Sequence, residues 1–371
     1  QGLDYISGMA EQPEDVKEWL TDKTEKFCQD KAIYNAIMDG IQIIDGQDKE
    51  RDTGQIPKLL TDALSVTFDN HIGHDYIYDS EARFDFYKKK EDRIPFDIDY
   101  LNKVTKGGLS KKTLNICLAG TGVGKSLFMC HCAAANIMQG YNPLYITMEM
   151  AEEKIAERID ANLLNVTIDE LKMLPKEAFE KKIERVANKA SGRMIIKEYP
   201  TAGAHVGHFR HLLQELKLKK GFTPDIIYID YLNICMSSRV RGANANSYTI
   251  VKSIAEELRG LAVEFNVPIV SATQVTRAGF SSSDIGLEDT SESFGLPATA
   301  DFMFAMVSTE ELEDLAQLLF KQLKNRYSDP NFNKRFVVGV DRSKMRLYDV
   351  EQDAQEDIIE DTPVFDNTDE G

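Results

Sequence analysis

The sequence predicts an α/β protein with a mainly parallel sheet flanked by helices. From about residue 93 onward, apolar runs of strand length alternate with helical patterns, which is typical of parallel strands joined by crossover helices. A glycine-rich loop stands between the first such strand and the helix that follows it, where this kind of fold binds phosphate. The chain of 371 residues is 42% hydrophobic, so it has enough apolar residues for one large or two ordinary domains.

The glycine-rich loop has the sequence Ala-Gly-Thr-Gly-Val-Gly-Lys-Ser and spans residues 119–126. Its glycines let successive N–H groups point at phosphates, Lys125 reaches the β- and γ-phosphates, and Ser126 binds Mg²⁺. Ala119 replaces the first glycine of the strict P-loop pattern, which is the mildest possible change. The loop predicts binding of ATP or another NTP together with Mg²⁺. The residues expected to hold the nucleotide are Gly120, Thr121, Gly122, Val123, Gly124, Lys125, Ser126 and Leu127.

Further apolar runs predict the remaining strands of the sheet. A helical pattern covers residues 247–265, and two runs at residues 335–340 and 345–348 predict an antiparallel hairpin at the sheet edge. The other predicted strands are residues 114–118, 143–147, 194–197, 226–229, 268–271, 302–306 and 318–323.

Composition divides the chain into three expected parts. Residues 1–92 contain an amphipathic helix and a polar linker at 45–54, and this helix is expected to pack either on its own domain or on a neighbouring subunit. Residues 93–350 form the nucleotide-binding domain, and residues 351–371 form an acidic tail expected to be disordered. The missing initiator Met suggests that an upstream domain is absent. The apolar residues of the helix are Val16, Leu20, Phe27, Tyr34, Met38 and Ile41.

Charge and cysteine content restrict the possible partners. A net charge of −17 argues against a broadly basic surface, so any nucleic acid has to be held by a local basic element. No apolar run approaches the length of a membrane span, and the N-terminal residues lack the pattern of a signal peptide. The five cysteines form no C-x-x-C pair, which indicates a reducing cytoplasm and no structural metal.

Polar residues at other strand ends predict the rest of the catalytic site. Asp230 ends the run 226–229 and is placed to hold Mg²⁺. Tyr231 follows it where many P-loop ATPases carry a Glu that acts as general base, so the base must come from elsewhere. Glu149 is the best candidate, because it follows a strand whose carboxyl end lies at the P-loop edge; alternatively, it caps the next helix. Gln274 either senses the γ-phosphate or is a satisfied polar residue in a turn.

Two basic groups leave their roles open. Lys324 and Arg326 are either solvated charges at the sheet edge or an arginine finger that acts on the next subunit. Arg239, Arg241 and Lys252 lie in a stretch without acidic residues and predict a mobile DNA-binding loop, although a solvated surface loop has the same composition.

Together, these motifs resemble those of the DnaB-family replicative DNA helicases over about residues 93–350, and most closely those of tailed phages. The resemblance implies a RecA-like fold and a homo-hexameric ring that moves 5′ to 3′ on single-stranded DNA by hydrolysing NTP. It implies that Glu149 is the catalytic base, Gln274 the γ-phosphate sensor, and Lys324 with Arg326 the finger pair acting in trans.

The resemblance also implies a second DNA loop at Ser291 to Gly295, with Ser291 where the bacterial pattern has Arg. The partners implied are replication-fork DNA, a primase and a helicase loader. The protein is expected in the cytoplasm, which is that of the host if a phage encodes the chain. Two other functions compete with this one: a RecA-type recombinase filament and a regulatory nucleotide-binding module. A module of the second kind does not need Glu149, Gln274 and Arg326 together.

Overall fold

The computed structural model describes residues 14–47, 53–64, 66, 74–88, 91–240, 246–275, 286–287 and 295–351. The chain divides into two compact units, residues 1–90 and 91–371. Most of the acidic segment 351–371 lies outside the described residues, as do Arg241 and Ser291 of the expected DNA loops.

The N-terminal unit is helical in its described part. The helix expected from the apolar spacing is present as α2 (Glu14–Ile44), and α3 (Ile56–Leu64) packs against it. Ala36, Ile43 and Ala63 are buried in this unit, whereas Phe27 keeps 68% of its surface exposed. The apolar side of α2 is therefore only partly covered within the unit. The other described elements here are η2 (Thr53–Gln55) and α4 (Ser80–Lys88).

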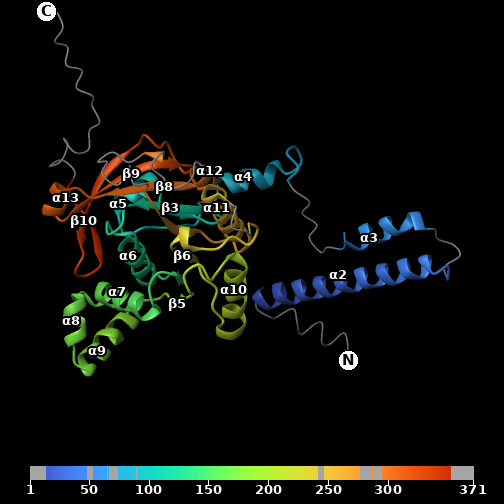
Figure 1. The fold of residues 1–371 in the computed structure, drawn as a ribbon, viewed down its shortest axis with the longest axis horizontal. Coiled ribbons are helices and arrows are strands. Elements are labelled where there is room, and N and C mark those ends of the chain that lie inside the picture. Colours follow the sequence, from blue (N-terminus) through green and yellow to red (C-terminus); the bar gives the residue numbers. More distant parts are fainter. Residues whose placement is uncertain are drawn as a thin grey trace, which may run out of the picture. The chain divides into compact units, whose positions relative to one another are not determined.

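The second unit is built on one sheet, and the predicted α/β class is confirmed (Figure 1). Nine strands of the described chain lie in the order β11-β10-β9-β8-β3-β7-β6-β4-β5. Neighbours from β8 to β5 in this order are parallel, while β9, β10 and β11 add antiparallel strands at one side. The hairpin predicted at the edge is therefore confirmed. The strands are β3 (Leu114–Ala119), β4 (Pro143–Thr147), β5 (Ile195–Glu198), β6 (Ile226–Asp230), β7 (Ile269–Gln274), β8 (Phe302–Val307), β9 (Gln317–Asn325), β10 (Arg335–Asp341) and β11 (Arg346–Asp349).

Helices flank this sheet, and a short antiparallel pair, β1 (Arg93–Ile94) and β2 (Leu109–Ser110), precedes it. The helix predicted at residues 247–265 is α11, which ends one residue earlier. The helical elements of the unit are α5 (Asp99–Val104), α6 (Lys125–Met138), α7 (Glu152–Leu164), α8 (Ile168–Met173), α9 (Lys176–Ala187), α10 (Val206–Lys220), η3 (Leu232–Ile234), α11 (Ser247–Glu264), α12 (Gly295–Thr299) and α13 (Glu310–Asp314).

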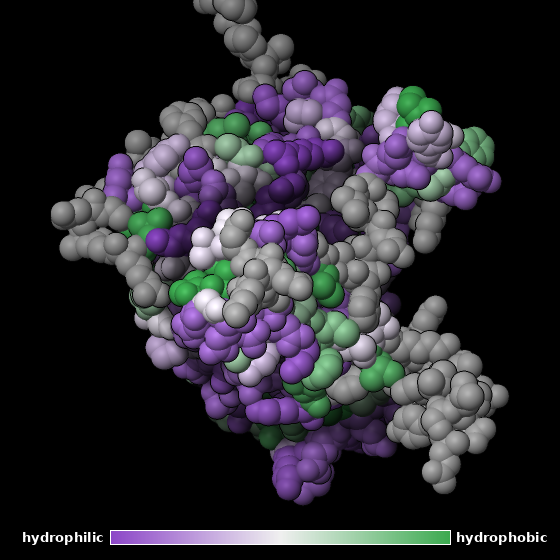
Figure 2. Space-filling model, turned by 90° about the vertical axis from the view of Figure 1, so that its right-hand side faces the viewer, coloured by the Kyte–Doolittle hydropathy of each residue, from purple (hydrophilic) through white to green (hydrophobic). Residues whose placement is uncertain are grey.

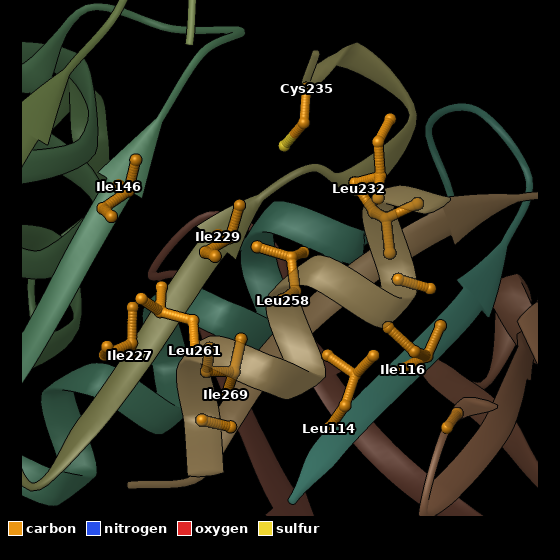
Figure 3. Packing of buried hydrophobic residues seen from close by; sticks show 14 of the residues in the cluster. Leu114, Ile116, Ile146, Ile227, Ile229, Leu232, Cys235, Leu258, Leu261 and Ile269 are labelled. Carbon is orange, nitrogen blue, oxygen red and sulfur yellow. The ribbon is translucent and has the colours of Figure 1, made fainter. Parts of the chain in front are cut away.

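Alternation along the strands gives the sheet an apolar core on each face. In β3, Leu114 and Ile116 point to the face covered by α10 and α11, whereas Cys117 points to the face covered by α6 and α7. Figure 3 shows the first of these cores, in which Leu258 of α11 lies over the strands. Full burial of such an aliphatic side chain stabilises the fold by about 1.5–3 kcal/mol. The two cores fix the sheet and hence the positions of its strand ends.

Among the residues described, no helix is both long enough and apolar enough to span a membrane. On the face shown in Figure 2, hydrophobic residues occur in small separate groups among hydrophilic ones. Scattered groups of this kind are ordinary for a protein surface.

Candidate functional site

The P-loop joins β3 to α6 as the sequence predicts. Ala119 is the last residue of β3, is fully buried, and pairs with Gln274 on one side and Met306 on the other. Because Ala119 has ordinary strand geometry, the position tolerates a Cβ, which explains why the first glycine of the strict pattern is dispensable here. Gly122 and Gly124, by contrast, have φ angles of 81° and 137°, which residues with a Cβ atom rarely adopt.

Lys125 is the first residue of α6 and is buried beneath the loop. Its Nζ atom donates to the backbone carbonyls of Ala119 at 3.3 Å and Gly120 at 3.0 Å. The pKa of Lys125 is lowered overall, because the effect of burial outweighs the opposite effect of nearby acidic groups such as Glu149. The ammonium group therefore lies in a partly desolvated position at the centre of the loop, where its attraction for phosphate is stronger than in water.

Asp230 ends β6 and is completely buried beside the P-loop. Its Oδ2 atom accepts a hydrogen bond from the Tyr145 hydroxyl at 2.9 Å, whereas Oδ1 has no hydrogen-bond partner among the described residues. Burial raises the pKa of Asp230, and the neighbouring Ser126 hydroxyl, the Tyr145 hydroxyl and the cations Arg158 and Lys125 lower it. A buried carboxylate oxygen without a partner, next to a serine hydroxyl, fits a hard divalent cation such as Mg²⁺. The described residues contain no cluster of three or more acidic, His or Cys side chains that would hold a metal by itself.

Glu149 follows β4 and faces the same pocket. Burial raises its pKa, as does the charge of Asp230, while Lys125 and Arg158 lower it. The N-cap of α7 is Ala151, and the first-turn N–H of Glu152 donates to Glu198 at 3.2 Å. No hydrogen bond of this helix start that the structure gives uses Glu149, so its carboxylate stays at the pocket.

Gln274 ends β7, the strand next to β3 on the side of β6 and β4. Its Nε2 atom donates to the hydroxyl of Tyr231 at 3.1 Å, and the ring of Tyr231 lies 6.0 Å from Lys125 Nζ. The residue that replaces the expected Glu therefore links the amide to the P-loop lysine.

The P-loop, Glu149 and Gln274 line a pocket of about 290 Å³ at the carboxyl edge of the sheet. Two arginines that the sequence reasoning missed also line it, Arg158 from α7 and Arg342 from the turn between β10 and β11. Arg342 Nη1 donates to the carbonyls of Gly122 at 3.3 Å and Val123 at 3.0 Å. A cavity of about 970 Å³ adjoins the pocket and shares Gly122 and Arg342 with it. No local sequence signal marks either arginine, since both reach the pocket from separate elements. The pocket is lined by Thr121, Gly122, Gly124, Lys125, Ser126, Leu127, Glu149, Met150, Arg158, Gln274, Arg342 and Met345.

Lys324 and Arg326 lie at the opposite edge of the sheet from this pocket. Asn325 pairs with Phe302 at the start of β8, and Phe302 pairs with Asn115 near the start of β3, whereas the P-loop follows the end of β3. The length of the strand therefore separates these cations from the P-loop of their own protomer. Arg326 forms an ion pair with Asp301 at 2.8 Å.

The described candidates for DNA contact lie around α11. Arg239 forms an ion pair with Glu256 at 2.7 Å and donates to the Ser253 carbonyl at 3.1 Å, so its guanidinium is engaged within the protomer. Lys252 lies 3.9 Å from Glu256. Gly295, at the start of α12, packs so closely against Lys252 that an added Cβ would lie 2.8 Å from its Cγ. The structure thus brings Lys252 and Gly295 together, while Arg241 and Ser291 fall outside the described residues.

Comparisons with known proteins agree with this arrangement. The family model of the DnaB-like helicase C-terminal domain matches residues 94–324. The DnaB-like replicative helicase of Enterobacteria phage T4 is 46% identical over 360 residues, which cover 94% of this chain and 76% of the relative. A probable plasmid replicative DNA helicase of Chlamydia psittaci is 26% identical over 209 residues, and the match spans only 43% of that relative.

Two solved structures share the fold. The ATPase domain of G40P superposes with a TM-score of 0.63 at 17% identity and covers 75% of this chain and all of its own. A DnaB-like replicative helicase, whose structure was solved to describe its interactions with primase, superposes with a TM-score of 0.61 at 15% identity, covering 94% and 83%. These matches confirm the RecA-like fold that the resemblance to the helicase family implies.

Proposed function

We propose, since the chain belongs to the family of DnaB-like helicases, that the pocket at the carboxyl edge is the site where this replicative DNA helicase hydrolyses NTP. The observation that carries the assignment is the meeting of the P-loop, a carboxylate with a raised pKa and a strand-end amide in one pocket. The recombinase and the regulatory module are disfavoured by this family membership.

In the proposed mechanism, the N–H groups of the P-loop and Lys125 bind the phosphates and compensate their charge. Glu149 accepts a proton from a water molecule while the oxygen of that water attacks the γ-phosphorus. The bond from the γ-phosphorus to the β–γ bridging oxygen then breaks. The amide of Gln274 hydrogen bonds to the γ-phosphate and so distinguishes NTP from NDP. The raised pKa of Glu149 makes it a stronger base than a solvated glutamate.

Mg²⁺ fits the site formed by Ser126 and Asp230, where a buried carboxylate oxygen has no other described partner. The ion would supply charge neutralisation on the phosphate oxygens. Serine and one aspartate leave most coordination positions to phosphate and water, as Mg²⁺ commonly requires.

We further propose that six copies form a ring and that each site is completed by Lys324 and Arg326 of the neighbour. Their position at the far edge of the sheet supports this role, because neither residue is placed to serve the pocket of its own protomer. Arginines contributed in this way stabilise the charge that develops on the transferred phosphoryl group.

The DNA contacts proposed for the pore are Arg239, Arg241, Lys252, Ser291 and Gly295. Single-stranded DNA in the pore, movement 5′ to 3′, and binding of a primase and a helicase loader at the replication fork complete the proposal. It places the protein in the host cytoplasm if a phage encodes it.

The decisive experiment measures NTP hydrolysis and strand separation with purified protein. Hydrolysis is expected to rise on addition of single-stranded DNA. Duplexes with a single-stranded 5′ tail are expected to unwind, whereas duplexes with only a 3′ tail are not. ATP, GTP and dTTP are tested in parallel. Electron microscopy with NTP is expected to show closed rings. Open filaments without unwinding would favour the recombinase, and hydrolysis that ignores DNA would favour the regulatory module.

A further inference from the structure

Asp301 is a buried carboxylate that connects the proposed finger to other parts of its protomer. It lies between α12 and β8, and its side chain is 6% exposed. Its Oδ1 atom accepts hydrogen bonds from Arg326 Nη1 at 2.8 Å and from Arg259 Nη2 at 3.1 Å. Its Oδ2 atom accepts from Arg259 Nε and from the backbone N–H of Leu114, each at 3.0 Å. One carboxylate thus contacts β3, α11 and the residue that follows β9.

The backbone reinforces the same connection. The N–H of Asp301 donates to the Leu114 carbonyl at 2.8 Å, and the N–H of Arg326 donates to the Asp301 carbonyl at 3.0 Å. Leu114 is the first residue of the strand that carries the P-loop at its other end. The finger segment is therefore attached to the rigid centre of the sheet.

The two arginines use the carboxylate differently. Arg259 binds both oxygens, a geometry that fixes the orientation of a carboxylate strongly. Arg326 makes a single charge-assisted bond to it and remains 48% exposed. The bond to Asp301 thus holds Nη1 of Arg326 while about half of its side chain stays exposed.

A neighbouring cation is held in a similar way. Lys324 Nζ donates to the carbonyls of Pro297 and Ala298, and Arg326 Nη2 lies 3.4 Å from the Ala298 carbonyl. Both carbonyls belong to α12, which leads directly into Asp301. The finger pair therefore has a common support in the segment 297–301.

We propose that Asp301 is a positioning residue for Arg326: it sets where the guanidinium is presented to the nucleotide site of the neighbouring protomer, and Arg259 fixes the carboxylate that does so. The inference rests on the proposed function, in which Arg326 acts in trans. It predicts a defect that appears in the neighbour's site and not in the protomer that carries the substitution.

The test uses Asp301→Asn, which removes the charge, keeps the size and leaves the P-loop untouched. Misplacement of a catalytic group by about 1 Å costs up to about a hundredfold in rate, so kcat is expected to fall about tenfold to a hundredfold. KM for NTP is expected to change little, because Arg326 is proposed to act on the transition state rather than on nucleotide binding.

Mixing locates the defect. Lys125→Ala protomers have an intact finger and an intact Asp301 but a defective P-loop, whereas Asp301→Asn protomers have an intact P-loop. In mixed rings, some interfaces combine the sound finger of one with the sound P-loop of the other, so activity above that of either variant alone is expected. A substitution that merely destabilised its own protomer would show no such recovery.

Glu264→Gln is the matched control. Glu264 also lies on α11 and pairs with both Nε and Nη2 of an arginine, Arg210, but neither residue contacts Arg326. This variant is expected to keep its kcat. Thermal unfolding and ring assembly are measured for every variant, and if Asp301→Asn does not assemble, Arg259→Gln takes its place, with a smaller loss of kcat and the same recovery expected.

The outcomes separate this inference from the proposed function. The reference mixture is Arg326→Ala with Lys125→Ala. If the reference mixture recovers activity but the Asp301→Asn or Arg259→Gln mixture does not, or if these variants keep a full kcat, Asp301 does not position the finger. If mixed rings form and the reference mixture itself fails to recover, the trans role of Arg326 is wrong and this inference is wrong with it.

Discussion

The two edges of the sheet in residues 91–371 differ in how their functional residues are assembled. At the carboxyl edge, Gln274 ends a strand, the P-loop and Glu149 follow the ends of two others, and all three face one pocket. At the amino edge, Arg259, Asp301 and Arg326 come from a helix, a connecting segment and a strand end, and they hold one another by charge.

In our proposal, neither edge forms a complete site alone. The carboxyl edge offers phosphate-binding groups and a base. The amino edge carries Arg326, which the length of a strand separates from the pocket of its own protomer. A ring places the amino edge of one protomer against the carboxyl edge of the next in our proposal. The following predictions test this division of labour, beginning with the largest expected effect.

Lys125→Ala is expected to abolish hydrolysis, because it removes both phosphate binding and compensation of transition-state charge at the carboxyl edge. The measurement is steady-state NTP hydrolysis with single-stranded DNA. Lys154→Ala, which changes an exposed lysine of α7 paired with Glu157, is the control and is expected to keep normal turnover. Normal DNA-stimulated turnover in Lys125→Ala would refute the assignment of the site.

Arg326→Ala is expected to bind nucleotide normally and to lose about a thousandfold or more in kcat, the scale on which arginine fingers act. Because the residue is proposed to act across an interface, wild-type hydrolysis per protomer is also expected to rise steeply with protein concentration as rings form. Nucleotide binding and turnover are measured over a dilution series. Turnover independent of concentration, together with an active Arg326→Ala, would mean that the amino edge has no catalytic part.

Glu149→Gln is expected to bind nucleotide and to assemble but to hydrolyse at least about a hundredfold slower, as loss of a general base usually does. Glu153→Gln, an exposed carboxylate in the first turn of α7, serves as the control. If Glu149→Gln keeps its rate and weakens nucleotide affinity as much as Asp230→Asn does, the base must be sought elsewhere.

Replacing Arg239 and Arg241 together with Ala is expected to weaken single-strand binding, to flatten its salt dependence and to reduce DNA stimulation of hydrolysis. Arg239 also forms an ion pair with Glu256, so Arg239→Ala removes a contact within the protomer in addition to the proposed contact with DNA. DNA binding at several salt concentrations is the measurement. Unchanged DNA stimulation in the double variant would make the segment an ordinary solvated loop.

The smallest expected effect is a shift in pH dependence at the carboxyl edge. Burial and Asp230 raise the pKa of Glu149, and a base has to be deprotonated, so kcat should fall as the pH drops through this raised pKa. Arg158 lowers the pKa of both Glu149 and Asp230, so Arg158→Gln is expected to move the acid limb of the kcat profile to higher pH. Arg342 lines the same pocket but is not among the groups that shift the pKa of Glu149, so Arg342→Gln should leave the acid limb in place. An unmoved limb in Arg158→Gln would exclude Glu149 and Asp230 as the titrating groups.

The sequence by itself determined the strands, the P-loop and the carboxylates at the strand ends. These features are local: an apolar run predicts a buried strand, and glycines with a following Lys and Ser predict a phosphate loop wherever the rest of the chain lies. Even the long helix α11 and the edge hairpin followed from the periodicity of nearby residues.

Only the tertiary structure decided which strand ends meet and which edge each cation occupies. β3 lies between β7 and β8, whose sequence positions are more than a hundred residues further on, and this order places Gln274 beside Ala119. It also brings Arg158 and Arg342 into the pocket and leaves Arg326 at the opposite edge on Asp301. The physical reason is that strand order depends on packing both faces of the sheet with helices from distant segments, a condition that no short stretch of sequence contains.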